Sequence, residues 1–269
     1  MKLRQIGTMI SSFVLAAALV ACGGGESADT ATSASADGAA TTYRIATDTT
    51  FAPFEFAEAD GTYVGIDIEL LDAIAKDQGF EYTIDPVGFD AALQNVQVGQ
   101  ADGVIAGMSI TDARKEVFDF SDPYYDSTVC CAAIADGDIK SLDDLKGANV
   151  AVKNGTQSQA WAESIADQYG FTMTVFDSSD VMYQDVLAGN TVACFEDTPT
   201  MSYAIDDAGL NLEIVSIVDE TSEFATPYGF AVAKDQNAEL LEKFNAGLAD
   251  IKADGTYQTI IDKYVKSVE

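Results

Sequence analysis

Segments with the hydrophobic pattern of helices alternate with strand-like segments within residues 66–106, which read IDIELLDAIAKDQGFEYTIDPVGFDAALQNVQVGQADGVIA. Apolar residues recur at helical spacing over residues 66–75 and again over residues 89–98. Between and after these two helices, residues 81–86 and 103–106 have the composition of strands. This order of helix, strand, helix and strand predicts an α/β fold with mostly parallel sheets.

The same rhythm continues through the rest of the chain. Further strands are expected at residues 43–47, 62–64, 128–133, 149–152, 172–176, 191–195 and 228–232. Further helices are expected at residues 158–169, 180–188, 198–207, 238–252 and 256–264. These are more strands than we expect in a single sheet, so the pattern predicts two α/β lobes. Parallel sheets bind ligands beyond the carboxyl ends of their strands, and two facing sheets would enclose a cleft there.

Charge and composition exclude several classes of function. The chain has 269 residues, with 14 lysines and arginines against 44 aspartates and glutamates, and a net charge of −30. This charge counts against a basic nucleic-acid-binding face, so we expect no nucleic-acid partner. The chain has no histidine, which removes the Ser-His-Asp and Cys-His catalytic arrangements and every histidine-containing metal site. No C-x-x-C or other ligand spacing is present, so we expect no metal and no cofactor.

The first residues of the chain indicate export. Lys2 and Arg4 precede an apolar core at residues 13–21. That core is too short to cross a bilayer, which needs about 20 apolar residues. A short apolar core behind positive charges is typical of a signal peptide.

A possible lipid anchor follows directly. Residues 19–22 read LVAC and resemble the lipobox of bacterial lipoproteins, so residues 1–21 are expected to be a lipoprotein signal peptide and Cys22 to be lipidated. An ordinary cleaved signal is the alternative. Apart from Cys22, residues 22–42 contain only Gly, Ala, Ser, Thr, Asp and Glu. Such a segment has nothing to bury, and we expect a flexible tether.

The three remaining cysteines lie in apolar, strand-like runs. Cys130 and Cys131 are adjacent and cannot easily bridge each other. We interpret them and Cys194 as buried free thiols that act as small hydrophobic side chains. A disulfide that involves Cys194 is the alternative.

In the first half of the chain, polar and aromatic residues follow the ends of predicted strands. Asp48 comes directly after the first strand, with Phe51 nearby as an aromatic wall. Ser109 and Arg114 follow the strand at 103–106 and open a predicted helix. Helix N-termini attract anions, and an arginine guanidinium can hold a carboxylate through two hydrogen bonds. The alternatives are a turn aspartate among core aromatics and a surface arginine paired with an acid.

In the second half, a similar set follows two more strands. Lys153, Thr156 and Gln157 lie between the strand at 149–152 and the next helix, where they could form a second anion site. Glu196 and Asp197 end the strand at 191–195. Asp197 could simply cap the following helix, or it could bind the ammonium group of a ligand.

Together these groups suit a free α-amino acid. Its carboxylate would bind Arg114 and a helix N-terminus, and its ammonium would bind Asp197 and Ser109. Nothing in the set supplies a nucleophile with an adjacent base, so we expect a binding protein and not an enzyme.

Several stretches, taken in order along the chain, resemble one known family. They include ATDTTFAPFEF at 46–56, VGIDIELLDAIAKDQGF at 64–80, ADGVIAGMSITDARKEVFDFSDPYYDS at 101–127, LKGANVAVKNGTQS at 145–158 and EDTP at 196–199. The chain resembles the polar amino acid substrate-binding proteins of ABC importers, which form solute-binding protein family 3. Within that family it looks most similar to glutamine-binding proteins.

The resemblance implies a fold and a way of working. The fold is the two-lobed periplasmic-binding-protein-like fold of type II, with two α/β lobes joined by a two-strand hinge. The protein would be a monomer that binds an amino acid by hinge closure and delivers it to an ABC permease. It would be extracytoplasmic, held at the cell membrane by a lipid anchor. The implied boundaries are 43–124 plus 228–269 for the first lobe, 129–222 for the second, and 125–128 and 223–227 for the hinges.

The resemblance also implies roles for individual residues at the amino acid backbone of the ligand. Arg114 would bind the α-carboxylate with help from Thr156 and the backbone amide of Gln157. For the α-ammonium, the implied partners are Asp197, Ser109 and the carbonyl of Gly107.

Other positions would contact the ligand's side chain. Phe51 and Phe89 would enclose its aliphatic stem. Asp48 and Lys153 match positions that bind the side-chain amide in glutamine binders, since an amide can donate to the one and accept from the other.

One position departs from the glutamine-binder pattern. Where close glutamine binders carry a histidine before the aspartate, this chain has Glu196, which could pair with Lys153 or favour a cationic ligand. Lys153 counts against a basic ligand, and Asp48 with Glu196 counts against an acidic one. We therefore expect glutamine, with a basic or other polar amino acid as the alternative. A dehydratase-like enzyme on the same fold is a further alternative.

Overall fold

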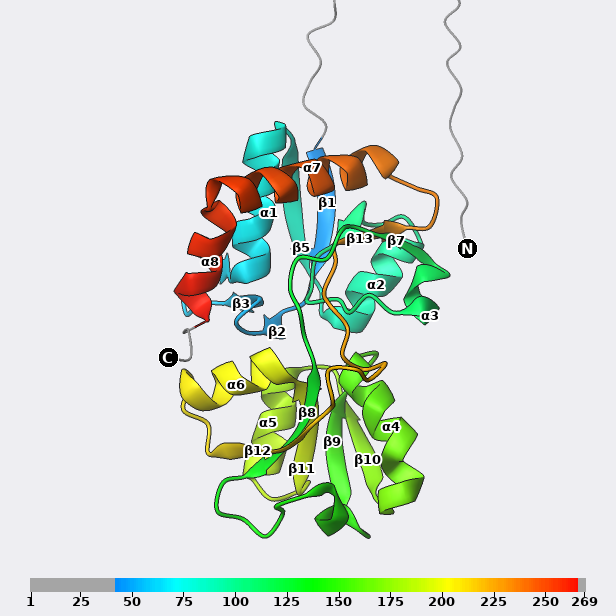
Figure 1. Ribbon diagram of the computed structural model, residues 1–269, viewed down its shortest axis with the longest axis vertical. Coiled ribbons are helices and arrows are strands. Elements are labelled where there is room, and N and C mark those ends of the chain that lie inside the picture. The colour runs from blue at the N-terminus through cyan, green and yellow to red at the C-terminus, as the bar shows by residue number, and fades with distance from the viewer. Residues whose placement is uncertain (1–41, 266–269) are drawn as a thin grey trace, which may run out of the picture. The chain divides into compact units, whose positions relative to one another are not determined.

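The computed structural model describes residues 42–265 of the chain (Figure 1). The predicted signal peptide, the lipidation of Cys22 and the predicted tether as far as residue 41 lie outside this range. Residues 266–269, at the end of the predicted first lobe, also lie outside it.

The first lobe is built on a five-stranded sheet with the order β5-β1-β6-β13-β7. In this sheet β1 runs parallel to β5 and β6, whereas β13 runs antiparallel to β6 and β7. Its strands are β1 (Thr42–Thr47), β5 (Glu81–Pro86), β6 (Gly103–Val104), β7 (Phe118–Phe120) and β13 (Ala231–Ala233). A small antiparallel sheet in the same lobe contains β2 (Thr50–Phe51), β3 (Glu55–Ala57) and β4 (Tyr63–Val64).

Amphipathic helices cover this sheet with their apolar faces. In the first of them, Ile66, Leu70 and Ile74 are fully buried, and Gly79 ends the helix in the left-handed conformation. The helices of the lobe are α1 (Ile66–Gln78), α2 (Phe89–Gln97), α3 (Asp112–Lys115), α7 (Ala238–Asp254) and α8 (Thr256–Tyr264). None of the helices within residues 42–265 has the length and hydropathy that crossing a membrane requires.

The second lobe repeats this design with a second five-stranded sheet, in the order β10-β9-β11-β8-β12. Here β9 runs parallel to β10 and β11, while β8 runs antiparallel to β11 and β12. Its strands are β8 (Val129–Ile134), β9 (Asn149–Lys153), β10 (Thr172–Phe176), β11 (Ala193–Asp197) and β12 (Leu212–Ile217). Its helices are the 3-10 helix η1 (Leu142–Leu145), α4 (Gln157–Tyr169), α5 (Ser179–Leu187) and α6 (Thr198–Asp206).

The chain passes twice between the two sheets, once from β7 to β8 and once from β12 to β13 (Figure 1). The predicted hinge segments 125–128 and 223–227 lie inside these two passages. At Tyr228 the passages meet, because its backbone N–H donates to the carbonyl of Tyr125 at 2.7 Å. The strand after each passage, β8 or β13, runs antiparallel to its neighbours, since the chain enters that sheet from the hinge side.

The predicted α/β fold with two lobes is confirmed, with differences in detail. In each sheet four strands run in the same direction, as expected for mostly parallel sheets, and one strand, β13 or β8, runs against them. The strands β2, β3, β7 and β12 were not expected; the first three have only two or three residues, which is too short for a periodic pattern to be recognised. The strand expected at 228–232 begins at Ala231, and Tyr228 forms only isolated bridges.

The three described cysteines are buried and free. Cys130 and Cys131 follow each other along β8, so they face opposite sides of the sheet and belong to different apolar clusters. Cys194 lies in the same cluster as Cys130.

Gly65 allows the segment before α1 to approach the start of that helix. Its backbone has φ 128° and ψ 175°, a combination that is essentially restricted to glycine. A β-carbon at this position would lie 2.1 Å from the carbonyl oxygen of Phe54. The absence of a side chain at Gly65 therefore allows the carbonyl of Phe54 to reach the first turn of α1, where it accepts a hydrogen bond from the Asp67 backbone N–H at 2.9 Å.

We expect Gly65→Ala to lower the free energy of unfolding by about 3 kcal/mol or more, because strain and overpacking add. Gly61→Ala is the matched control. Gly61 also has a positive φ, of 86°, but no atom lies within 4 Å of the added β-carbon, so its cost should be about 1–2 kcal/mol. Urea unfolding measures both changes, and equal losses in the two variants would contradict the proposed steric role of Gly65.

Candidate functional site

Residues from both lobes enclose a cavity at the carboxyl ends of β1, β6, β9 and β11. It contains about 240 Å³ of atom-free space, part of it open to solvent. Every residue that the sequence predicted as ligand-binding lies in its wall, except Glu196, and Ala106 is an addition. The wall consists of Asp48, Phe51, Phe89, Ala106, Gly107, Ser109, Arg114, Lys153, Thr156, Gln157 and Asp197.

Arg114 brings a positive charge into this cavity without an acidic partner. It lies on the short helix α3, which Thr111 caps by accepting a hydrogen bond from the Arg114 backbone N–H at 3.2 Å. Its guanidinium donates to the carbonyls of Ser109 at 2.8 Å and Gly155 at 2.9 Å, and lies 5.2 Å from the centre of the Phe89 ring. It forms none of the salt bridges found among residues 42–265.

The electrostatics of Arg114 reflect this position. Loss of water around the guanidinium lowers the pKa of Arg114 to about 10, although Asp197 and Tyr228 act in the opposite direction. A guanidinium with this pKa remains charged at neutral pH. Since a guanidinium has five N–H donors and Arg114 makes the two hydrogen bonds given above, it has donors left for an anion that enters the cavity.

Asp197 supplies the opposite charge on the other lobe. It ends β11 and is only 4% exposed. Its Oδ2 accepts a hydrogen bond from the hydroxyl of Tyr228 at 2.6 Å, whereas its Oδ1 has no partner among the described residues. Asp197 precedes α6 without capping it through its side chain. The simple capping role that the sequence left open is therefore not observed.

Burial is the main reason that the pKa of Asp197 rises to about 7, and the neighbouring Glu196 adds to the rise. Tyr228, Arg114 and Lys153 act against it. A cation beside Oδ1 would favour the ionised form. The cavity thus has an unpaired cation and an unpaired carboxylate oxygen on separate parts of its wall, which can bind the two charges of one zwitterionic molecule.

Lys153 and Asp48 form a buried ion pair between the lobes. Both side chains are 1% exposed, and the Lys153 ammonium contacts Asp48 Oδ2. The ammonium also lies 3.2 Å from Ser179 Oγ and 5.2 Å from the centre of the Phe51 ring. The positive charge at this end of the cavity is therefore balanced, in contrast to that of Arg114.

Glu196 lies behind the cavity rather than in its wall. Its carboxylate is fully buried and accepts hydrogen bonds from Ser179 Oγ, the hydroxyl of Tyr183 and the backbone N–H of Asp197, each at 2.9 Å. Burial raises the pKa of Glu196, while the Lys153 charge lowers it. The Ser179 hydroxyl accepts a hydrogen bond from the Lys153 ammonium and donates one to Glu196. The direct ion pair between Glu196 and Lys153 that the sequence suggested is therefore replaced by a contact through Ser179.

Three residues that support the site were missed by sequence reasoning. Ser179 and Tyr183 come from α5 and hold Glu196. Tyr228 is fully buried, donates to Asp197 and accepts from Ser127 Oγ at 2.9 Å. A tyrosine directly before the apolar run of residues 229–233 was the only signal for this role, and a core position explains such a tyrosine equally well.

Backbone geometry positions two further parts of the wall. Thr156 caps α4, since its Oγ1 accepts from the backbone N–H of Gln159 at 3.1 Å and donates to the Lys153 carbonyl at 2.8 Å. Gln157 therefore begins α4 at the cavity, where helical N–H groups lack partners in their own helix. On the first lobe, the Phe51 ring packs against Gly107 so closely that a β-carbon there would lie 2.3 Å from it.

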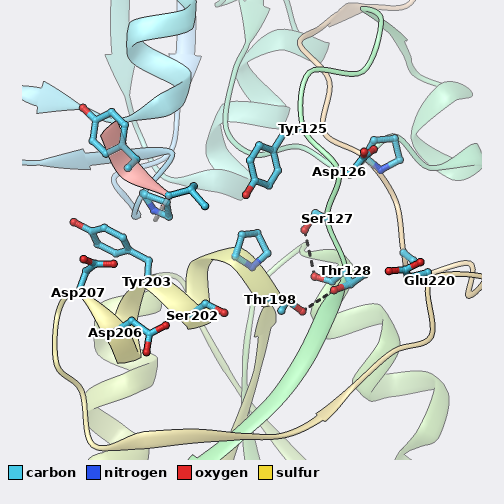
Figure 2. A pocket seen from close by; sticks show the side chains of 16 residues that line it. Tyr125, Asp126, Ser127, Thr128, Thr198, Ser202, Tyr203, Asp206, Asp207 and Glu220 are labelled. Carbon is cyan, nitrogen blue, oxygen red and sulfur yellow. Dashed lines mark hydrogen bonds between the residues drawn. The ribbon is translucent and has the colours of Figure 1, made fainter. Parts of the chain in front are cut away.

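A larger groove lies on the hinge side, between the first passage and α6 (Figure 2). Figure 2 shows Tyr125, Ser127 and Thr128 facing the residues of α6, and Thr128 Oγ1 donates to Thr198 Oγ1 at 2.8 Å. It encloses about 1590 Å³, including open solvent, but contains none of the predicted ligand-binding residues. Within residues 42–265, no three Cys, Asp or Glu side chains are grouped as a metal site. The smaller inner cavity is therefore the candidate site.

Residues 43–267 match the family described as "Bacterial extracellular solute-binding proteins, family 3". Among curated relatives, the "Putative ABC transporter arginine-binding protein 2" of Escherichia coli (strain K12) is 33% identical over 230 residues, which are 84% of this chain and 91% of that one.

Solved structures give similar matches. The Lactococcus lactis GlnP substrate binding domain 2 in open conformation is 44% identical, with a TM-score of 0.59 and coverage of 85% of this chain and 97% of that one. An ancestral arginine-binding protein has been solved with two ligands. With arginine it matches at 38% identity, TM-score 0.75 and coverage of 83% and 97% of the two chains. With glutamine it matches at 37% identity, TM-score 0.75 and coverage of 84% and 98%.

The buried carboxyl groups make stability depend on pH. Because the pKa of Asp197 is about 7 in the folded state and 3.8 is its ordinary value, the folded state binds more protons between these values. We expect the melting temperature of the ligand-free protein to rise as the pH falls from 7.5 to 5, by about 2–4 °C for each kcal/mol gained.

Asp197→Asn should reduce this rise, whereas Asp143→Asn, at an exposed position, should leave it unchanged. Scanning calorimetry at several pH values measures the effect. A melting temperature that falls equally in all three proteins between pH 7.5 and 5 would contradict the burial of ionisable carboxyl groups in the cleft.

Proposed function

The chain belongs to family 3 of the bacterial extracellular solute-binding proteins, and on that premise we propose that its inner cavity binds free L-glutamine for an ABC importer. Proteins of this kind bind amino acids outside the cytoplasm and work with an ABC permease. The relatives are transport binding proteins rather than enzymes, which supports binding without chemical conversion.

The single observation that carries the proposal is the separation of two unpaired charges in one cavity. The Arg114 guanidinium lacks an acidic partner, and Asp197 Oδ1 lacks a donor, among residues 42–265. An α-amino acid carries a carboxylate for the first and an ammonium for the second. We propose that Thr156 and the backbone N–H of Gln157 assist Arg114, and that Ser109 and the carbonyl of Gly107 assist Asp197.

The other end of the cavity supports a neutral amide as the ligand's side chain. Lys153 and Asp48 are paired there. Lys153 would repel a positively charged ligand side chain, and Asp48 would repel a negatively charged one. An amide group can donate to Asp48 and accept from Lys153 without adding charge. We propose that Phe51 and Phe89 enclose the methylene groups between the two ends.

Glu196 keeps a basic ligand open as the alternative. Counted with Asp48 and Asp197, it gives the site three acidic groups against Lys153 and Arg114. Its hydrogen bonds with Ser179 and Tyr183 point it away from the cavity, and this placement supports glutamine over arginine. The names of relatives include arginine-binding proteins, and the ancestral protein was solved with either ligand.

We propose that ligand binding closes the two lobes on each other. Arg114 donates to Gly155, and Lys153 pairs with Asp48, so residues of the two lobes already meet around the cavity. Similarity to known structures supports a closed arrangement. The TM-score is 0.75 with the ligand-bound ancestral protein but 0.59 with the open domain, although the latter has the higher identity. A ligand that contacts both lobes stabilises the closed state.

Calorimetry with the free amino acids tests the ligand. We expect glutamine to bind with a dissociation constant near micromolar, about −8 kcal/mol, and arginine, lysine and glutamate to bind at least about tenfold more weakly. Lys153→Met should weaken glutamine binding at least about tenfold and shift the preference towards arginine, because Asp48 then lacks its cation.

Lys140→Met is the matched control, since the Lys140–Glu213 ion pair is about half exposed and should not affect binding. Wild-type protein that prefers arginine, or a Lys153→Met variant with unchanged preference, would contradict the assignment of Lys153 and Asp48 to an amide.

We further propose that the mature chain is held at the membrane by lipid on Cys22. The sequence at 19–22 supports this, and Cys22 lies outside the described residues. Expression with a clickable fatty acid in a bacterial host should label the protein, and Cys22→Ser should abolish the label. Cys194→Ser, at a buried thiol, is the control. Equal labelling of Cys22→Ser and wild type would exclude the anchor.

A further inference from the structure

Two fully buried carboxyl groups lie beneath the segment that contains Gly107. Glu55 is on β3 and Asp67 is in the first turn of α1, and both side chains have 0% exposure. Asp67 Oδ2 accepts hydrogen bonds from the backbone N–H of Gly107 and from the hydroxyl of Tyr124, each at 2.8 Å. Both oxygens of Glu55 and the Oδ1 of Asp67 lack an ordinary donor among the described residues.

Two such groups cannot both carry a full charge at low cost, because burial removes the water that would solvate them. Burial raises the pKa of Glu55 well above its ordinary value, and the neighbouring Asp67 and Asp48 add to the rise. Burial also raises the pKa of Asp67 to about 6, while the hydrogen bonds from Gly107 and Tyr124 and the neighbouring Glu55 carboxyl act in the opposite direction. Burial and the neighbouring carboxylates therefore favour the protonated form of Glu55, whereas the two donors to Asp67 Oδ2 favour the ionised form of Asp67.

The cation that acts on this pair, Lys153, is already bound to another carboxylate. Lys153 lowers the pKa of Glu55, but its ammonium is bound to Asp48. Tyr124, whose own pKa is raised well above its ordinary value, donates to Asp67 as a neutral hydroxyl. Within residues 42–265, no three acidic or cysteine side chains form a metal site that could include these two.

We propose that Glu55 and Asp67 share one proton, donated by Glu55 to Asp67 Oδ1, and that this pair positions Gly107 for the ligand's ammonium. The role at the ammonium rests on the proposed function. The shared proton gives Asp67 Oδ1 the donor it otherwise lacks. It also keeps Asp67 Oδ2 a strong, charged acceptor for the Gly107 N–H.

Gly107 is held from two sides as a result. Asp67 binds its N–H, and the Phe51 ring occupies the space where a β-carbon would be. Gly107 also has a positive φ of 52°, which a glycine adopts without cost. A carbonyl fixed in this way needs no reordering when a ligand binds, and such preorganisation raises affinity. Glu55 and Asp67 are positioning residues, since neither lies in the cavity wall.

Infrared difference spectroscopy tests the shared proton directly and needs no ligand. A protonated carboxylic acid has a C=O stretching band above the amide I band, and this band shifts in D2O. We expect the band in wild-type protein at pH 7.5, and we expect Glu55→Gln to remove one component of it. Glu58→Gln, at an exposed position three residues further along, should leave the spectrum unchanged.

Affinity for L-glutamine, measured by calorimetry at the same pH, tests the positioning role. Glu55→Gln keeps a donor facing Asp67 and should bind within about threefold of wild type. Glu55→Leu removes the donor and leaves Asp67 Oδ1 unpaired, so it should bind at least about tenfold more weakly. Melting curves establish that each variant is folded at the temperature of the measurement.

The results separate this proposal from the proposed function. Wild-type protein without a protonated carboxyl band, or with a band that Glu55→Gln does not change, would overturn the shared proton. Glu55→Gln binding as weakly as Glu55→Leu would overturn the positioning role. Failure of wild-type protein to bind glutamine would instead contradict the assigned ligand, and the infrared result would still decide whether the proton is shared.

Discussion

The buried contact between Lys153 and Asp48 is the interaction on which the arrangement of the lobes depends. Each partner comes from the carboxyl end of a strand in a different sheet, and both are 1% exposed. Taking both ions out of water costs several kcal/mol per ion, and removing one partner from such a pair costs about 3–5 kcal/mol. The pair therefore links the two lobes and strongly disfavours any state that buries either charge alone. Ser179 and Glu196 extend it into a network behind the cavity.

Arg114 and Asp197 show the opposite design. Each is deprived of water, which moves the pKa of Arg114 down to about 10 and that of Asp197 up to about 7, yet neither pairs with the other. Such groups are costly in an empty cavity and become favourable once a ligand supplies the missing charges. The cavity thus has two different ends. At one end the charges of Lys153 and Asp48 neutralise each other without a ligand, and at the other end the charges of Arg114 and Asp197 need a ligand to pair with. If the proposed function holds, this division explains how a chain with a net charge of −30 would select a neutral zwitterion.

Much of the fold and several residues of the cavity wall could be predicted from local signals in the sequence, whereas Phe89 and Gly107 were implied only by the family resemblance. Hydrophobic periodicity indicated α1, and the polar residues that directly follow β1, β9 or end β11 were recognised as a group. Other features depend on tertiary contacts that no local pattern encodes. The antiparallel direction of β8 follows from the path through the hinge. The bond from Tyr228 to Asp197 joins residues 31 positions apart, and Glu196 turns towards α5 although its neighbour Asp197 faces the cavity.

The most direct test of the two unpaired charges uses ligands that each lack one charge. 4-Carbamoylbutanoate is glutamine without its α-ammonium, and 4-aminobutanamide is glutamine without its α-carboxylate. Calorimetry should show binding of glutamine and a loss of at least about 100-fold for each analogue, because each leaves Asp197 or Arg114 desolvated and unpaired. Binding of either analogue within about threefold of glutamine would contradict the assignment of Arg114 and Asp197 to the two ends of an amino acid.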